Sequence, residues 1–229
     1  MMSKFRFFVT YLILPVIVIT VIVGCSVDNY ETGDGEYSYM TSAFSMLSTD
    51  SQGKAVSFVT DADTEYTITS PLEIKGAKPD TTYRVLAYYN ETATKKTALR
   101  GIKTVYVLRP RPAESILAMA SDPVTFSSMW TSANGKYLNL GFYLMEGVAD
   151  KEDQTTQALG MAVSRNPQSA DAAHKSYDLT LLHSQNGVPE YYKTLVYASV
   201  PLDGYQQNDT LNITINTYDG TCQKTVIVP

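Results

Sequence analysis

The sequence predicts an all-β protein in which a small barrel is followed by a β-sandwich. Tyrosine is abundant, with 17 residues, and Thr and Val are frequent; these residue types are enriched in strands. Gly, Asn, Asp and Pro interrupt the chain at short intervals, as turns between short strands require. No long stretch has the period of an amphipathic helix, whereas several segments alternate apolar and polar residues.

The clearest alternation is Leu211–Asn216 (LNITIN), in which every second residue is apolar. This pattern predicts a strand with one buried and one solvated face. Tyr83–Tyr88 and Val105–Arg109 alternate less strictly and predict two further strands.

Three Asn-Gly or Asp-Gly pairs predict type I′ turns. The predicted turns are Asn134-Gly135 between Met129–Thr131 and Tyr137–Leu144, Asn186-Gly187 between Tyr177–Leu182 and Leu195–Val200, and Asp219-Gly220 between Leu211–Thr217 and Cys222–Val228. Gly147–Ala173 is diluted by acids, Gln and Ala, and we expect a long loop there with at most a helical turn at Ala170–His174.

A domain boundary is predicted at Arg109-Pro110-Arg111-Pro112, because two prolines resist both helix and sheet and form a stiff spacer. Residues 37–110 hold about five strand candidates, which suits a barrel of the OB type. Residues 111–229 hold about seven, which suits a β-sandwich.

The first 24 residues have the features of a signal peptide. Lys4 and Arg6 precede an apolar run over Phe7–Val23, and Ile22-Val23-Gly24-Cys25 resembles the lipobox at which lipoprotein signal peptides are cut. The resemblance implies that Cys25 is lipidated and that the lipid holds the protein on a membrane. The alternative is an uncleaved N-terminal anchor with a chance Cys.

Residues 25–36 are predicted to be the lipidated Cys and a flexible acidic tether. Acids directly after the lipidated Cys resemble the export signal that sends Bacteroidota lipoproteins to the outer face of the outer membrane. The alternative is a generic acidic linker. We therefore predict an outer-membrane location, with the surface favoured over the periplasmic face.

Removal of Lys4 and Arg6 from the 18 basic residues leaves 16 against 23 acidic ones, a net charge of −7 for the mature chain. This balance argues against a nucleic-acid partner, whose phosphates are bound by Lys and Arg clusters. Once Cys25 is lipidated, Cys222 has no partner for an intrachain disulfide.

Two segments of the chain resemble the NigD-like lipoproteins of Bacteroidota. The family has a Trp-bearing strand that turns into a Tyr-Leu-Asn strand, and this is similar to Val124–Trp130 followed by Tyr137–Phe142. The family's Leu-His-Asn segment is similar to Leu181–Gly187, although His183 is not followed directly by Asn. The resemblance implies a lipidated Cys, an OB-like N-terminal domain and a C-terminal β-sandwich. One family member was proposed as a bacteriocin immunity protein, which supplies a hypothesis.

The sequence predicts no catalytic residue, metal site or cofactor. Its two histidines, His174 and His183, have no metal-ligand spacing around them, and no GxSxG motif occurs. His183 is expected at the surface or at a sheet edge. The carboxylates of Asp61 and Asp63 are expected on a solvated face or, as the alternative, sharing one cation.

Exposed tyrosines are the remaining lead, because a Tyr on a rigid sheet covers contact area at low entropic cost. Tyr88, Tyr89, Tyr191 and Tyr192 are the candidate binding residues, with ordinary strand tyrosines as the alternative. Trp130, the only Trp, is expected in the sandwich core.

Two Asp-Thr motifs, at Thr81 and Thr210, resemble O-glycosylation acceptors of Bacteroidota. We predict a non-catalytic binding or protective module for a glycan, a peptide or an outer-membrane protein. The alternatives are a structural subunit of a surface assembly that pairs through its terminal strand Cys222–Val228, and, less favoured, a hydrolase with an unrecognised site.

Overall fold

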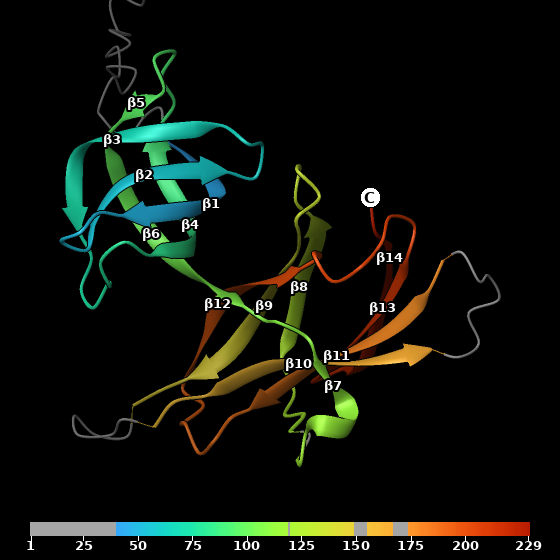
Figure 1. Cartoon of the computed structure of the whole chain (residues 1–229). Helices are drawn as coiled ribbons and strands as arrows, with labels where there is room; N and C mark the ends of the chain where they lie inside the picture. The colour runs from blue at the N-terminus through green and yellow to red at the C-terminus, as the bar shows by residue number, and fades with distance from the viewer. Residues whose placement is uncertain (1–39, 119, 149–154, 167–173) are drawn as a thin grey trace, which may run out of the picture. The chain divides into compact units, whose positions relative to one another are not determined.

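Strands account for nearly all regular structure in the computed structural model, which describes residues 40–118, 120–148, 155–166 and 174–229 (Figure 1). The predicted all-β class is confirmed. The elements are β1 (Met40–Thr49), β2 (Lys54–Thr60), β3 (Glu65–Glu73), β4 (Thr82–Asn90), β5 (Lys96–Thr97), β6 (Leu99–Val107), β7 (Arg111–Pro112), η1 (Ala113–Ser115), β8 (Thr125–Thr131), β9 (Tyr137–Glu146), β10 (Ala158–Asn166), β11 (Ser176–Ser184), β12 (Tyr192–Pro201), β13 (Thr210–Thr217) and β14 (Gly220–Ile227).

The first strands form the OB-like barrel. Strands β1, β2 and β3 form an antiparallel meander, β4 pairs with the free side of β1, and β6 pairs with β4. The short β5 pairs parallel with β3, so the sheet curls back toward its first hairpin. The enclosed core consists of Leu47, Ala55, Phe58, Tyr66, Ile68, Val85, Ala87 and Tyr89.

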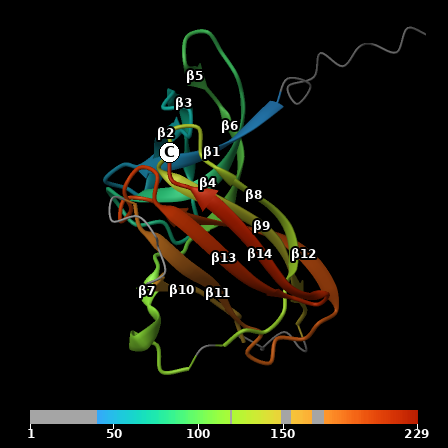
Figure 2. The same cartoon turned by 90° about the vertical axis from the view of Figure 1, so that its right-hand side faces the viewer.

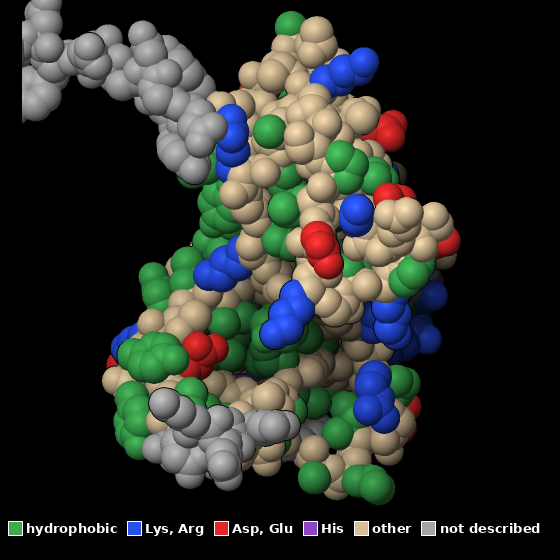
Figure 3. Space-filling view, turned by 90° about the vertical axis from the view of Figure 1, so that its left-hand side faces the viewer, with side chains coloured by type: hydrophobic (Ala, Val, Ile, Leu, Met, Phe, Trp, Pro, Cys, Tyr) green, Lys and Arg blue, Asp and Glu red, His purple; other side chains and the backbone are tan. Residues whose placement is uncertain are grey.

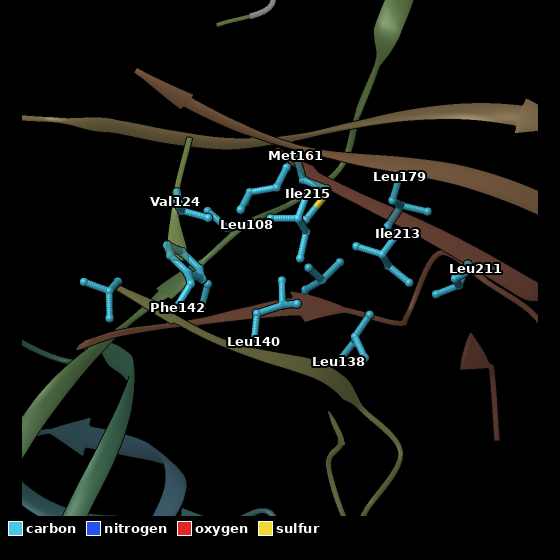
Figure 4. Packing of buried hydrophobic residues seen from close by; sticks show 14 of the residues in the cluster. Leu108, Val124, Leu138, Leu140, Phe142, Met161, Leu179, Leu211, Ile213 and Ile215 are labelled. Carbon is cyan, nitrogen blue, oxygen red and sulfur yellow. The ribbon is translucent and has the colours of Figure 1, made fainter. Parts of the chain in front are cut away.

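The later strands form the β-sandwich. Strands β12, β9 and β8 face a second sheet of order β14-β13-β11-β10-β7 (Figure 2). Figure 4 shows Leu138, Leu140 and Phe142 of β9 pointing toward Ile213 and Ile215 of β13. All five side chains are at most 1% exposed, because each strand directs alternate residues into the space between the sheets.

Barrel and sandwich strands belong to one nine-stranded sheet of order β5-β3-β2-β1-β4-β6-β12-β9-β8. The link is a parallel pairing of β6 with β12, in which Tyr197 lies opposite Val105, and Leu108 N–H donates to Ser199 O at 2.9 Å. The segment predicted to be a spacer also takes part in a sheet, because Arg111 and Pro112 pair with β10. The domain boundary itself stays a prediction.

The predicted hairpins β8–β9 and β13–β14 are confirmed, but their turn types are not I′. In Asn134-Gly135 and Asp219-Gly220 only the glycine has a positive φ, whereas a type I′ turn needs positive φ at both central residues. Asn186 and Gly187 do both have positive φ, at 50° and 76°. Their turn connects β11 to β12, which lie in different sheets, so it joins the two layers of the sandwich.

The expected long loop over Gly147–Ala173 is wrong in its middle, where Ala158–Asn166 forms β10 and pairs with β11 along its whole length. Gly160 and two alanines dilute the apolar pattern there, although Met161 and Ala162 are buried. The possible turn at Ala170–His174 falls mostly outside the described residues. Within the residues that are described, no helix has the length and apolarity that a membrane span requires.

Candidate functional site

Aromatic side chains from the barrel and the sandwich meet where β1 approaches β8 and β12. The Phe44 ring of β1 lies edge to face with Trp130 of β8, with 5.2 Å between ring centroids, and with Tyr197 of β12 at 5.3 Å. Gly141 of β9 leaves room for this packing, because a Cβ there would lie 2.7 Å from Ser128 Oγ and 3.3 Å from the Tyr197 ring.

Trp130 belongs to this junction, and the prediction that it lies in the sandwich core is wrong. A β-bulge between Phe126 and Ser128 shifts the alternation of β8, so that Phe126 and Met129 both pack on the sandwich core. Trp130 lies opposite Asn139, whose neighbours Leu138 and Leu140 point inward. Its partly buried indole therefore faces away from the core.

A buried network of polar side chains beside these rings connects the barrel to the sandwich. Arg84 of β4 has a side chain with 0% exposure and makes a bidentate ion pair with Asp61, at 2.5 and 2.7 Å. It also donates from Nη2 to Asn139 Oδ1 and from Nε to Ser199 Oγ, both at 3.1 Å. Ser199 Oγ donates to Asn139 Oδ1 at 2.6 Å. The guanidinium is thus held by residues of both the barrel and the sandwich.

The two carboxylates of the Asp61-Ala62-Asp63 segment do not share a cation. Asp61 pairs with Arg84, whereas Asp63 accepts from Lys136 Nζ at 2.9 Å and from Asn134 Nδ2 at 3.0 Å. Both residues lie in the β2–β3 turn, where the positive φ of Asp63, 54°, breaks the extended backbone, and each carboxylate has a different partner. Among the described residues, no group of three or more His, Cys, Asp or Glu side chains is placed to hold a metal ion.

A cleft of about 460 Å³ opens beside these rings, between the β2–β3 turn and the β8–β9 turn; we call it the junction cleft. It brings together four aromatic rings, two carboxylates and no Lys, Arg or His. Its lining residues are Ala43, Phe44, Thr60, Asp61, Ala62, Thr64, Tyr66, Tyr89, Glu91, Trp130, Thr131, Ser132 and Ala133.

Tyr89, one of the predicted binding residues, lies deep in this cleft and is 5% exposed. Its ring packs on Tyr66 at 4.8 Å between centroids. Burial, followed by hydrogen bonding to Tyr66, raises the pKa of Tyr89 above its usual value, so the phenol stays neutral. The Tyr66 hydroxyl lies 3.3 Å from Glu91 Oε1 and 3.3 Å from Lys95 Nζ, which places a polar edge on an otherwise aromatic wall.

The other predicted pair, Tyr191 and Tyr192, lies away from the junction cleft, so the four candidate tyrosines do not form one site. Tyr191 and Tyr192 are 69% and 53% exposed, and Tyr192 lines a separate cavity of about 440 Å³ together with Tyr106 and Glu146. Tyr88 is half-buried on β4, opposite Gly101 of β6. The junction cleft therefore gains Tyr89 alone from the predicted set.

His183 is buried, at 2% exposure, and the prediction of a surface position is wrong. It shares the inward face of β11 with Leu179 and Leu181, because the apolar alternation continues through it. Its Nδ1 lies 3.1 Å from Asp122 O, and its Nε2 lies 2.7 Å from Gln157 Oε1. Both ring nitrogens thus have partners that hold the start of β8 and β10 against β11.

The remaining predicted positions are partly outside the structure. Cys25 lies outside the described residues. Thr81 Oγ1 donates to Pro79 O at 2.8 Å, and Thr210 is half-buried on β13. Cys222 is a free thiol. The face in Figure 3 mixes Lys and Arg with Asp, Glu and broad apolar areas.

Sequence reasoning missed Phe44 and Glu91, which line the cleft, and Arg84, which holds the lining residue Asp61. Arg84 carried a usable signal, since an Arg before the apolar run Val85-Leu86-Ala87 is either exposed on a strand face or buried and paired. Phe44 and Glu91 carried none.

The fold defines a protein in which an OB-like barrel precedes a β-sandwich. Residues 109–228, just over half of the chain, match the family model of the NigD-like C-terminal β-sandwich domain. The chain belongs to the NigD-like family, which confirms the resemblance seen in its sequence. No curated protein matches it.

Solved structures of proteins from Bacteroides and Parabacteroides species share this fold. A NigD-like immunity protein from Bacteroides caccae aligns with a TM-score of 0.64 at 19% identity, over 82% of this chain and 97% of that one. A protein provisionally named toxin-related, from Parabacteroides distasonis, aligns with a TM-score of 0.60 at 14% identity, over 82% and 92%. A protein provisionally named a lipoprotein, from Bacteroides fragilis, aligns at 0.53 and 12% identity, over 82% and 96%.

Proposed function

We propose that this protein is a lipid-anchored, non-catalytic binding module that holds its ligand in the junction cleft. The observation that carries the proposal is the cleft itself, where Phe44, Tyr66, Tyr89 and Trp130 surround about 460 Å³. Ligand sites are typically concave, mostly apolar and lined by a few placed polar groups. Since the walls come from both the barrel and the sandwich, the site forms only when both are folded and packed together.

The Arg84 network supports the proposal because it presets the walls. Asp61 lies in the cleft lining, and its carboxylate is fixed by two hydrogen bonds from a guanidinium that the sandwich also holds. A preformed site loses little conformational entropy when a ligand binds. A fixed aromatic cleft suits recognition.

The non-catalytic part of the proposal rests on the chemistry of the cleft. Its lining has two carboxylates, one of them neutralised by Arg84, and no Lys, Arg, His or Cys. The buried His183 contacts the Asp122 carbonyl and the Gln157 side chain rather than a nucleophile. The NigD-like family name and the immunity protein among the structural neighbours agree with a protective or binding role.

The membrane part rests on the lipobox ending at Cys25 and on the lipoprotein name of one neighbour. We place the lipid anchor on the outer membrane, with the folded part favoured on the cell surface. A glycan, a peptide or another outer-membrane protein is the partner class that this location makes available.

Trp130 makes the test direct, because it is the only Trp of the chain and lines the cleft. Glycans and peptides from the cell's surroundings are screened by Trp130 emission, and each binder is recovered for mass spectrometry. We expect a saturable emission change with a ligand of unchanged mass. A ligand that is cleaved during incubation would contradict the non-catalytic proposal, and binding that survives Trp130→Ala and Tyr89→Ala would move the site elsewhere.

One observation favours the second candidate, a subunit of a surface assembly. Strand β14 lies at the edge of the five-stranded sheet, pairs with β13 alone, and exposes Ile227 at 63%. An exposed edge is a template for strand addition. Self-association abolished by Thr225→Pro, with folding retained, would favour this role.

A further inference from the structure

We infer that the junction cleft recognises a cationic group, an ammonium or a guanidinium, carried by a peptide. This inference rests on the proposed function, because it names the ligand class for the same cleft. It is carried by the cations of the chain that lie on the rings at this place, by the exposed ion pair of Glu91 with Lys95, and by the angles between the rings.

The aromatic rings at the junction already bind cations of the chain itself. Lys95 Nζ lies 5.1 Å from the centroid of the Tyr66 ring, and the Arg84 guanidinium carbon lies 5.5 Å from that of Phe44. Both distances are within the roughly 6 Å over which a cation is attracted to the negative face of a ring. Tyr66 and Phe44 both line the cleft.

Charge complementarity points the same way. Of the two carboxylates in the lining, Asp61 pairs with the buried Arg84, whereas Glu91 pairs with the partly exposed Lys95 at 3.6 Å and accepts from the Tyr66 hydroxyl at 3.3 Å. The lining itself contains no Lys, Arg or His, and Lys95 beside Glu91 is the cation that a ligand would displace. A ligand ammonium that displaces Lys95 would take over its contacts with the Glu91 carboxylate, the Tyr66 hydroxyl and the Tyr66 ring.

The ring angles favour a cation over a sugar ring. Phe44 and Trp130 are inclined at 77°, and Tyr66 and Tyr89 at 55°. Sugar stacking needs a flat exposed ring face, but Tyr66 and Tyr89 are only 1% and 5% exposed and Phe44 packs edge to face on Trp130. A compact cation needs only the place on the Tyr66 ring that Lys95 now occupies.

Lys95 acts as a resident competitor for the ligand. Its side chain is 44% exposed, and its contacts with the Tyr66 hydroxyl and Glu91, at 3.3 and 3.6 Å, are long. Such exposed pairs contribute little and are easily exchanged. Removal of the Lys95 ammonium should therefore strengthen the binding of an external cation.

The experiment titrates the folded mature chain with the peptide acetyl-Gly-Lys-Gly-amide and with its norleucine analogue, and follows Trp130 emission. We expect a saturable change with the lysine peptide that weakens with added salt, and none with norleucine. Lys95→Met should tighten binding about fivefold and Glu91→Gln should weaken it about fivefold, a typical ratio for one partly exposed cation contact.

Matched controls are Lys193→Met and Glu114→Gln, which make the same charge changes at exposed residues outside the cleft. They should leave the affinity within twofold. Equal binding of the norleucine peptide, or no tightening by Lys95→Met, would overturn the cationic ligand class while the binding module stands. If a neutral glycan alone changes Trp130 emission, the cleft is a binding site for another class of ligand. If neither peptide binds to wild type or Lys95→Met, the inference is wrong.

Discussion

Arg84 Nη2 donates a hydrogen bond to Asn139 Oδ1 at 3.1 Å, and this bond joins β4 of the barrel to β9 of the sandwich. Because the guanidinium also pairs with Asp61 in the wall of the junction cleft, one side chain couples the positions of the barrel, the sandwich and the cleft. The buried side-chain network therefore sets the shape of the candidate site.

Replacement of Arg84 by Met should destabilise the protein by about 3–5 kcal/mol, because the mostly buried Asp61 carboxylate loses its partner. Denaturant unfolding measures the free energy. Arg109→Met is the control, since its pair with Asp203 is exposed on both sides and should contribute less than about 1 kcal/mol. In the Arg84→Met, Asp61→Ala double variant, part of the loss should return. Strictly additive losses would show that the ion pair contributes nothing.

Trp130→Ala should cost about 1–3 kcal/mol, less than the ~3–5 kcal/mol expected for Phe142→Ala. Phe142 has no exposed surface in the sandwich core, whereas Trp130 is partly exposed and packs mainly on Phe44. Iodide should quench part of the wild-type Trp emission. Emission that is fully protected from iodide, together with a loss as large as that of Phe142→Ala, would return Trp130 to the core.

Stability should fall in acid through Asp209. Burial opposes ionisation of this carboxylate, but hydrogen bonds from the backbone N–H groups of Gln206 and Lys175, at 2.9 and 2.8 Å, prevail and hold its pKa below the usual value. A depressed folded pKa contributes stability above the unfolded pKa of ~3.9, and this stability is lost as pH falls through the folded value.

Asp209→Asn should therefore cost about 1.5–3 kcal/mol at pH 7, the range for hydrogen bonds to a charged group, and less below about pH 4. Urea unfolding at several pH values measures both variants. A loss that is the same at pH 3 and pH 7 would contradict the role of the charge.

The sandwich should fold without the barrel. Its core draws only on residues from Leu108 onward, so residues 108–229 should unfold cooperatively. We expect lower stability than in the full chain, because Asn139 and Ser199 lose Arg84 and β12 loses its pairing with β6. Circular dichroism during urea unfolding tests this, and a transition without cooperativity would show one indivisible domain.

Cys25→Ala should abolish fatty-acid labelling and leave an unprocessed precursor, because the thiol of the lipobox is the acceptor of the lipid. Metabolic labelling with an alkyne fatty acid reads out the modification, and Cys222→Ala, which changes the other cysteine, is the control. Labelling of Cys25→Ala at the wild-type level would refute the lipid anchor.

The sequence by itself determined the all-β class, two hairpins and the family, because these follow from local signals. Alternation in Leu211–Asn216 predicted β13, and the glycines at 135 and 220 marked chain reversals that their positive φ angles explain. The resemblance around Trp130 identified the family although the side chain was assigned to the wrong face.

Only the tertiary structure decided the site. One extra residue in β8 turned Trp130 from the sandwich core toward Phe44, a residue 86 positions earlier. Arg84 became a buried ion because Asp61, Asn139 and Ser199 converge on it from three separate segments. The register of a bulged strand and the pairing of β6 with β12 depend on the packing of whole sheets, so no local pattern encodes them.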